Sequence, residues 1–187
     1  MKIFLKIGLA ICLTQLIGCT SSKAILYSGN KTKSEIVTVY VPQQFIHVVN
    51  GNKLAGTFNY QDGHFVELIY LDSGHASLQG TMSTNFQDFG SKYKYTEWSF
   101  KVGVDFKAGH TYMLYWEEYN EKPVISGRDL GELGDSFSPI INEFGFVEGG
   151  RQSLIERQKA YYESLINKGS SIKIINEEYL ETHNKKS

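Results

Sequence analysis

The chain has 187 residues, a length that suits one domain of ordinary size, and its 19 Lys and Arg residues nearly balance its 20 Asp and Glu residues. The basic residues are scattered and form no stripe interleaved with aromatics, so the electrostatic pattern of a nucleic-acid-binding protein is missing. Twelve Tyr, 11 Phe and 18 Gly against three Pro indicate aromatic-rich strands joined by tight turns.

The N-terminus has the pattern of an export signal. Two lysines lie near an apolar run, residues 7–17, which is shorter than the roughly 20 residues of a membrane-spanning helix and is typical of a signal peptide. The run ends in Leu16-Ile17-Gly18-Cys19, which resembles the lipobox of bacterial lipoproteins. The resemblance implies that residues 1–18 are a lipoprotein signal peptide, removed before Cys19, and that Cys19 is lipidated.

Lipidation of Cys19 by two or three acyl chains predicts a lasting membrane anchor. In the lipoproteins that this motif resembles, an aspartate after the cysteine is typical of retention at the inner membrane. Thr20 stands there instead and favours the outer membrane, with the domain facing the periplasm. The alternative interpretation is a plain signal peptide with a chance cysteine. Since Cys12 is discarded with the signal, the mature chain is expected to have no thiol for a disulfide, for catalysis or for a metal.

Residues 19–34 are expected to form a lipidated tether, and its apolar residues 24–27 are expected to dock on the domain. A single domain is predicted over residues 35–175. Its first strand, residues 35–41, is β-branched on both alternating faces, as in a strand that is buried on both sides. A hairpin follows, because Asn50-Gly51 is a strong two-residue turn signal.

Alternating apolar residues and turn signals predict about seven strands and hence an antiparallel β-sandwich in a mainly β fold. The clearest strand is 96–106, in which large apolar residues occupy one face and polar residues the other. Residues 83–91 are expected to form a loop. The seven predicted strands are 35–41, 45–49, 53–58, 65–71, 75–82, 96–106 and 111–116.

The turns between these strands carry a second resemblance. They contain Val39-Tyr40-Val41-Pro42, Val49-Asn50-Gly51-Asn52-Lys53-Leu54, Leu71-Asp72-Ser73-Gly74-His75-Ala76-Ser77-Leu78 and Phe106-Lys107-Ala108-Gly109-His110-Thr111-Tyr112. The order of these segments resembles the PEGA-like sandwich domains of bacterial envelope lipoproteins, several families of which have unknown function. The chain departs from their pattern at Asn50, Ser73 and His110. The resemblance spans residues 35–116, implies a β-sandwich and carries no chemistry.

Residues 117–150 are expected to form a long surface segment with a short strand at 124–125. One C-terminal helix, about residues 152–168, is predicted to open with a capping box at Ser153 and Glu156 and to stop at Gly169. Its apolar residues, which are expected to pack on the sandwich, are Leu154, Ile155, Tyr161, Tyr162, Leu165 and Ile166. An edge strand at 172–175 and a flexible tail at 176–187 complete the prediction.

Four histidines, His47, His64, His75 and His110, lie in the strand region, and two of them follow turn glycines. A metal site at one sheet edge is therefore conceivable, but no His-x-His spacing supports it. We expect turn-flanking histidines and no metal or other cofactor.

The acidic residues Glu117, Glu118, Asp129, Glu132 and Asp135 could provide paired carboxylates or a calcium site. A solvated acidic loop is expected, because the alternating ligand spacing of a calcium loop is missing. No serine elbow or phosphate-binding loop is present in the sequence.

Tyr93, Tyr95, Tyr115 and Tyr119 could form a flat platform for a glycan or a protein, or could simply line a tyrosine-rich sandwich, which is the favoured interpretation. The sequence as a whole predicts a non-catalytic accessory or binding module, held on the membrane through Cys19, with an envelope protein as its partner. The alternatives are a glycan- or cell-wall-binding or hydrolytic module and a periplasmic immunity protein for a secreted toxin.

Overall fold

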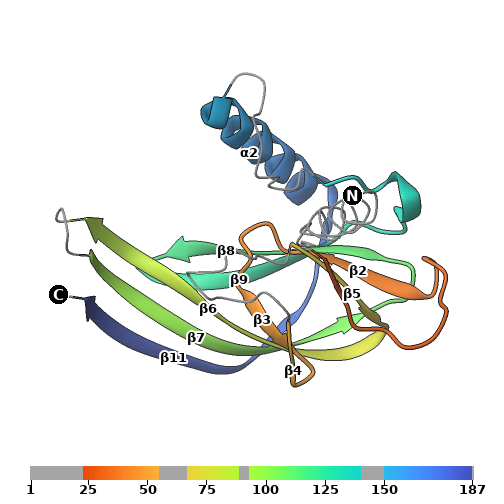
Figure 1. The fold of residues 1–187 in the computed structure, drawn as a ribbon, viewed down its shortest axis with the longest axis horizontal. Helices are drawn as coiled ribbons and strands as arrows, with labels where there is room; N and C mark the ends of the chain where they lie inside the picture. Colours follow the sequence, from red (N-terminus) through yellow and green to blue (C-terminus); the bar gives the residue numbers. More distant parts are fainter. Residues whose placement is uncertain (1–22, 55–66, 89–92, 140–149, 187) are drawn as a thin grey trace, which may run out of the picture.

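The computed structural model describes residues 23–54, 67–88, 93–139 and 150–186. The fold is mainly β, with two sheets and one long helix (Figure 1). The six-stranded sheet contains, in spatial order, β1 (Lys23–Ile25), β5 (Leu68–Asp72), β2 (Ile36–Tyr40), β8 (Thr111–Tyr119), β9 (Lys122–Asp129) and β10 (Ser170–Ser171). The five-stranded sheet contains β11 (Ile174–Lys186), β7 (Tyr93–Phe106), β6 (Gly74–Asp88), β3 (Ile46–Val49) and β4 (Asn52–Lys53).

The six-stranded sheet is mixed, so the prediction of a purely antiparallel arrangement is wrong. β1 runs parallel to β5, and β2 runs parallel to β8, while the other pairs in this sheet are antiparallel. Parallel neighbours need a long crossover connection. Between β2 and β8, the chain supplies this crossover by building β3, β4, β6 and β7 of the other sheet.

Strand β2 is buried on both faces, as its β-branched sequence predicts. Val37 and Val39 lie in an apolar cluster that takes side chains from both sheets, including Leu78 of β6 and Val102 of β7. Tyr40 points the other way, into a second cluster on the opposite face of the six-stranded sheet. This sheet is therefore the middle layer between the five-stranded sheet and the helix.

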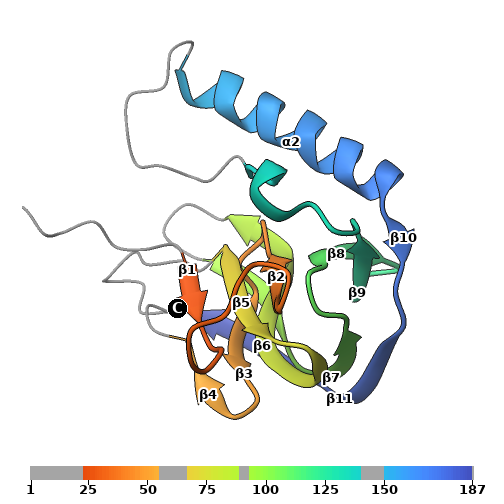
Figure 2. The same cartoon turned by 90° about the vertical axis from the view of Figure 1, so that its right-hand side faces the viewer.

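Helix α2 (Gly150–Lys168) covers that second cluster (Figure 2). Four residues of the predicted apolar face, Tyr161, Tyr162, Leu165 and Ile166, belong to the cluster, together with Tyr40, Leu68, Met113 and Tyr115. The helix begins at Gly150, so Ser153 lies within it and the predicted capping box is wrong. Arg151 and Gln152 are good helix formers that extend the helix toward the N-terminus. The predicted end before Gly169 is confirmed.

The Asn50-Gly51 hairpin is confirmed, with φ angles of 50° and 78° and with Val49 opposite Asn52. A second turn of the same kind joins β8 to β9 through Asn120 and Glu121, whose φ angles are 50° and 64°. Residues 117–129 therefore form strands and a tight turn, and the prediction of a long surface segment is wrong there. The sequence does not predict this turn, because Glu rarely adopts positive φ.

Two strands extend beyond their predicted ends. β6 continues to Asp88, so the predicted loop over 83–91 is wrong as far as Asp88. The predicted tail at 176–187 is wrong as far as Lys186, since β11 pairs with β7 from Ile174 onward. Backbone pairing needs no apolar side chains, so this polar segment forms a strand although its composition predicts a flexible tail.

The N-terminal boundary also moves. β1 belongs to the six-stranded sheet, and Ala24 within it and Leu26 directly after it pack against the shared core. The predicted docking is thus confirmed for Ala24 and Leu26, whereas Ile25 is 66% exposed. The strands of the two sheets run from residue 23 to residue 186, beyond the predicted 35–175. Eleven strands are present in the described residues, more than the seven predicted. The predicted strand residues 55–58 and 65–66 lie outside the described part.

Candidate functional site

The predicted lipidation site, Cys19, lies outside the described residues. The structure shows where the chain enters the domain: Lys23, four residues later, pairs with Leu68 at the edge of the six-stranded sheet. Four residues span at most about 14 Å. In the described part of the chain, no helix is both long and apolar enough to cross a membrane.

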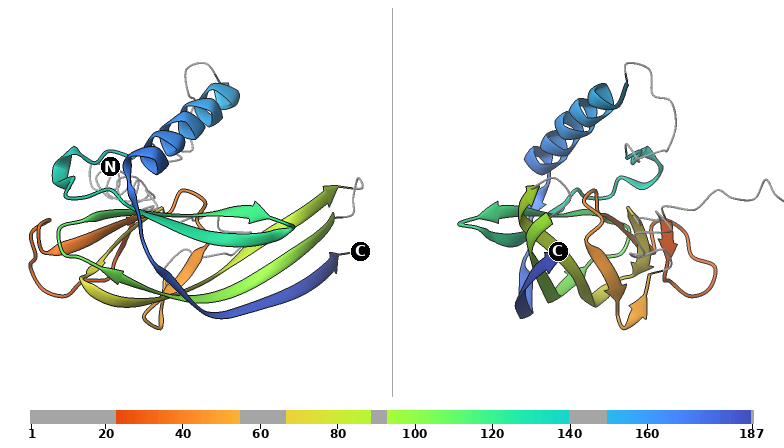
Figure 3. Two further views of the ribbon diagram at one scale, coloured as in Figure 1. Left: turned by 180° about the vertical axis from the view of Figure 1, so that it is seen from behind. Right: turned by 60° about the vertical axis from the view of Figure 1, so that its left-hand side comes forward.

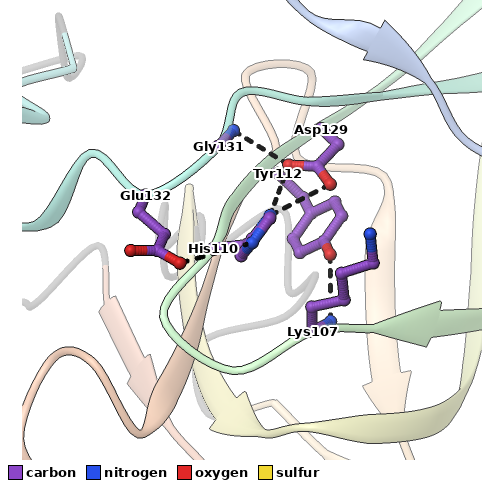
Figure 4. Close-up of polar contacts among 6 residues, drawn as sticks. All are labelled: Lys107, His110, Tyr112, Asp129, Gly131 and Glu132. Carbon is purple, nitrogen blue, oxygen red and sulfur yellow. Dashed lines mark hydrogen bonds and ion pairs between the residues drawn. The ribbon is translucent and has the colours of Figure 1, made fainter.

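Of the polar candidates from the sequence, the structure brings together His110, Asp129 and Glu132 (Figure 4). His110 directly precedes β8 and Asp129 ends β9, so the antiparallel pairing of these strands places the two residues side by side. The His110 Nδ1–H donates to the Asp129 carboxylate oxygens at 2.9 and 3.0 Å. The His110 Nε2 lies 3.8 Å from the Glu132 carboxylate.

The surrounding backbone and rings hold this group in place. The Asp129 Oδ1 also accepts a hydrogen bond from the Gly131 N–H at 2.8 Å. The ring of Tyr112 stacks on His110 with centroids 6.1 Å apart, and its hydroxyl accepts from the Lys107 N–H at 2.9 Å. Burial raises the pKa of Tyr112, so its hydroxyl stays protonated. Hydrogen bonds and ring stacking therefore hold His110, Tyr112 and Asp129 together, whereas the Glu132 side chain is 79% exposed.

An imidazole oriented by a carboxylate can move protons in catalysis, provided a nucleophile or substrate reaches its other nitrogen. Here the other nitrogen of His110 faces Glu132, whose side chain is 79% exposed. This arrangement suits an electrostatic clamp between the start of β8 and the loop after β9. In the residues that the structure describes, no group of three His, Cys, Asp or Glu residues could hold a metal ion.

The other described histidines lie elsewhere. His75, in the five-stranded sheet, contacts Asp105 at 2.9 Å on the exposed face. His47 lies on β3, where burial, followed by the charge of Lys53, lowers its pKa. His64 is outside the described residues. His75 and His110, although both follow a turn glycine, therefore belong to different sheets and have different carboxylate partners.

The acidic candidates are also separated. Glu117 and Glu118 are consecutive residues of β8 and therefore point to opposite faces of the sheet. Asp135 pairs with Lys33, whereas Asp129 pairs with His110. Asp129 and Asp135 therefore contact different basic residues and form no carboxylate pair.

The two described tyrosines of the predicted platform, Tyr115 and Tyr119, lie in different environments. Tyr115 is buried beneath helix α2, whereas Tyr119 is 70% exposed at the tip of the β8–β9 hairpin. The side chains of Tyr93 and Tyr95 lie outside the described part of the structure. Tyr115 therefore packs at the helix interface, on the face of the six-stranded sheet away from the five-stranded sheet, and does not line the space between the two sheets as predicted.

Sequence reasoning missed a groove of about 270 Å³ on the five-stranded sheet. Its lining comes from four strands that are distant in sequence, so no local motif could reveal it. The lining residues are His47, Val48, Gln79, Gly80, Thr81, Ser99, Phe100, Lys101, Glu178 and Leu180. The lining contains a single carboxylate, Glu178, whereas glycoside hydrolysis requires two.

Comparisons of the chain with protein-family models, with curated proteins and with solved structures found no match.

Proposed function

We propose that this protein is a lipoprotein anchored to the outer membrane through Cys19, whose periplasm-facing domain is a non-catalytic binding module of the cell envelope. The observation that carries the proposal is the Leu16-Ile17-Gly18-Cys19 motif, placed directly after an apolar run too short to span a bilayer. In this proposal the two sheets form a β-sandwich of the PEGA-like kind, and an envelope protein is the partner.

The position of β1 supports the proposal and sharpens it. β1 begins at Lys23, so only three residues lie between the proposed lipidated cysteine and the first strand. A tether of at most about 14 Å keeps the edge of the six-stranded sheet next to the membrane surface. A partner that binds near β1 would therefore lie at the membrane surface.

The first experiment is metabolic labelling with a clickable palmitate analogue. Cells expressing the wild-type chain or the Cys12→Ala variant should incorporate the label, because Cys12 lies in the signal peptide that is removed. The Cys19→Ala variant should lose the label, because the thiol that receives the diacylglycerol is gone. Cys12→Ala is the matched control, since it removes the only other cysteine of the chain.

Fractionation of the same cells tests the location. The labelled wild-type protein should co-fractionate with the outer membrane. If Cys19→Ala leaves both labelling and membrane association unchanged, the lipid anchor is wrong. If the labelled protein co-fractionates with the inner membrane, the lipid anchor is right and the outer-membrane location is wrong.

A further inference from the structure

The four terminal strands of the two sheets differ greatly in length in the described structure. The six-stranded sheet ends in β1, with three residues, and in β10, with two, and the five-stranded sheet ends on one side in β4, with two. The remaining edge is β11, which has 13 residues (Figure 3). Short edges offer little backbone for another strand to pair with, whereas a long edge is a template for pairing.

The edge strand also has exposed apolar side chains. Ile175 is 41% exposed and Leu180 is 54% exposed, and these are two of the five large hydrophobic residues most exposed in the described structure. A bulge between Asn176 and Glu178 interrupts the pairing of β11 with β7. Beyond it, Glu178–Lys186 runs in unbroken register against Lys101–Tyr93. This nine-residue stretch is the part of the edge that can accept another strand.

The charges of this stretch are arranged asymmetrically along the strand. Its first half contains Glu178 and Glu181, and its second half contains His183, Lys185 and Lys186. A second copy in the antiparallel direction would place the acidic half opposite the basic half. A parallel copy would instead place like charges opposite each other, which is unfavourable.

We propose that β11 pairs with β11 of a second copy of this chain, antiparallel, about a twofold axis at Thr182, so that the two five-stranded sheets join into one. In this register Glu178 lies opposite Lys186, and Glu181 lies opposite His183. Every pair joins residues of the same strand parity, so the two faces of each sheet continue across the junction.

The register follows from the bulge and the charges. Thr182 is the centre of Glu178–Lys186, so this register uses the whole unbroken stretch. A shift of two residues toward the N-terminus would place Glu181 opposite the Glu181 of the second copy and would run into the bulge. The interface is small, so we expect a dissociation constant in the micromolar range, roughly 1–100 μM. The inference does not depend on the lipid anchor.

Disulfide crosslinking of the full chain tests the axis directly. With Cys12 and Cys19 both replaced by alanine, the chain has no other thiol. Thr182→Cys should then form a covalent dimer under mild oxidation, since directly opposed residues of antiparallel strands have Cβ atoms about 4.5–5.5 Å apart. Ser73→Cys, an exposed position in the turn before β6, is the matched control and should remain monomeric.

Charge reversal tests the register. Glu178→Lys or Lys186→Glu alone should raise the dissociation constant about fivefold to tenfold in sedimentation analysis, and the double variant should restore it. Circular dichroism identifies any variant that fails to fold. The inference is overturned if Thr182→Cys crosslinks no more than Ser73→Cys, or if the double variant dimerises no better than the single ones.

Discussion

Asp129 shows how one side chain can fix the junction of two strands. Its carboxylate accepts hydrogen bonds from the His110 ring and from the Gly131 N–H, and only 14% of the side chain is exposed. Glu132 also faces His110, but at 3.8 Å and with 79% exposure. Partly buried hydrogen-bonded charges contribute more than exposed ion pairs, so the two carboxylates should differ in their effect on stability.

We therefore expect Asp129→Ala to lower the free energy of unfolding by about 1–3 kcal/mol, since it leaves two donors without their acceptor. Glu132→Ala should change it by less than about 1 kcal/mol. Urea unfolding followed by tryptophan fluorescence measures both variants. Equal losses for the two variants would contradict the assignment of Asp129 as the main partner of His110.

The tyrosines beneath the helix make a second prediction at this scale. Burial, the hydrogen bond to Tyr162 and the nearby charge of Glu67 raise the pKa of Tyr40, and burial also raises the pKa of Tyr161 and Tyr162. Below about pH 10, tyrosine is neutral in both the folded and the unfolded chain. Above that pH the unfolded chain loses protons that the folded chain retains, so the free energy of unfolding falls as the pH rises.

The urea concentration at the midpoint of unfolding should therefore stay constant between about pH 8 and 9 and should fall above about pH 10. Tyr40→Phe removes one of these phenols, so its midpoint should fall less steeply over the same range. Comparison with the wild type cancels the contribution of lysines, which are common to both chains. Parallel pH profiles for the two proteins would show that Tyr40 does not contribute.

Among the elements, the β8–β9 hairpin depends on a turn whose chemistry is unfavourable. Glu121 has a φ of 64°, in the left-handed region where residues other than Gly, Asn and Asp are strained. The antiparallel pairing of Tyr119 with Lys122 on either side of the turn imposes this conformation. The hairpin thus forms because its strands pair, in spite of the turn residue.

Glu121→Gly should raise the free energy of unfolding by about 0.5–1 kcal/mol, because glycine removes the strain but loses more conformational entropy on folding. Glu118→Gly, an exposed position in the adjoining strand, is the matched control. It should lower the free energy of unfolding by about 0.5–1 kcal/mol. Thermal melts of both variants give the sign, and a loss of stability in Glu121→Gly would contradict the explanation.

The elements that the sequence predicted well have signals within a few residues. Asn50-Gly51 predicts its hairpin, and the run of β-branched residues in β2 predicts burial on both faces of the strand. The helical face from Tyr161 to Ile166 is read from its spacing. The turn at Glu121 has no such signal, and for this reason β9 was not predicted over its full length.

At the scale of the whole molecule, β11 determines where the domain ends. It extends along β7, and Tyr179 packs against the core, with its ring 6.4 Å from that of Phe100. Its removal would expose the backbone edge of β7 and open the core beside Phe100. The C-terminal residues are thus part of the fold, in contrast to the flexible tail that their polarity suggests.

Deletion of residues 177–187 should lower the free energy of unfolding by more than about 3 kcal/mol, because it removes a partly buried aromatic, Tyr179, and most of a strand pairing. Deletion of Ser187 alone should have no effect and serves as the control. Circular dichroism and thermal unfolding compare the two chains. A truncated chain as stable as the control would show that β11 does not contribute to the fold.

Taken alone, the sequence determined the features encoded by neighbouring residues: a β-rich chain, the Asn50 hairpin and the apolar face of the helix. The anchor at Cys19 stays a prediction. Only the tertiary structure decided the parallel placement of β2 beside β8, the inclusion of β1 and β11 in the sheets, and the meeting of His110 with Asp129. The physical reason is that strands pair through backbone hydrogen bonds. Every residue except proline has both the N–H donor and the C=O acceptor for these bonds, whatever its side chain. The pattern of side chains along one segment therefore does not reveal which distant segment will lie beside it.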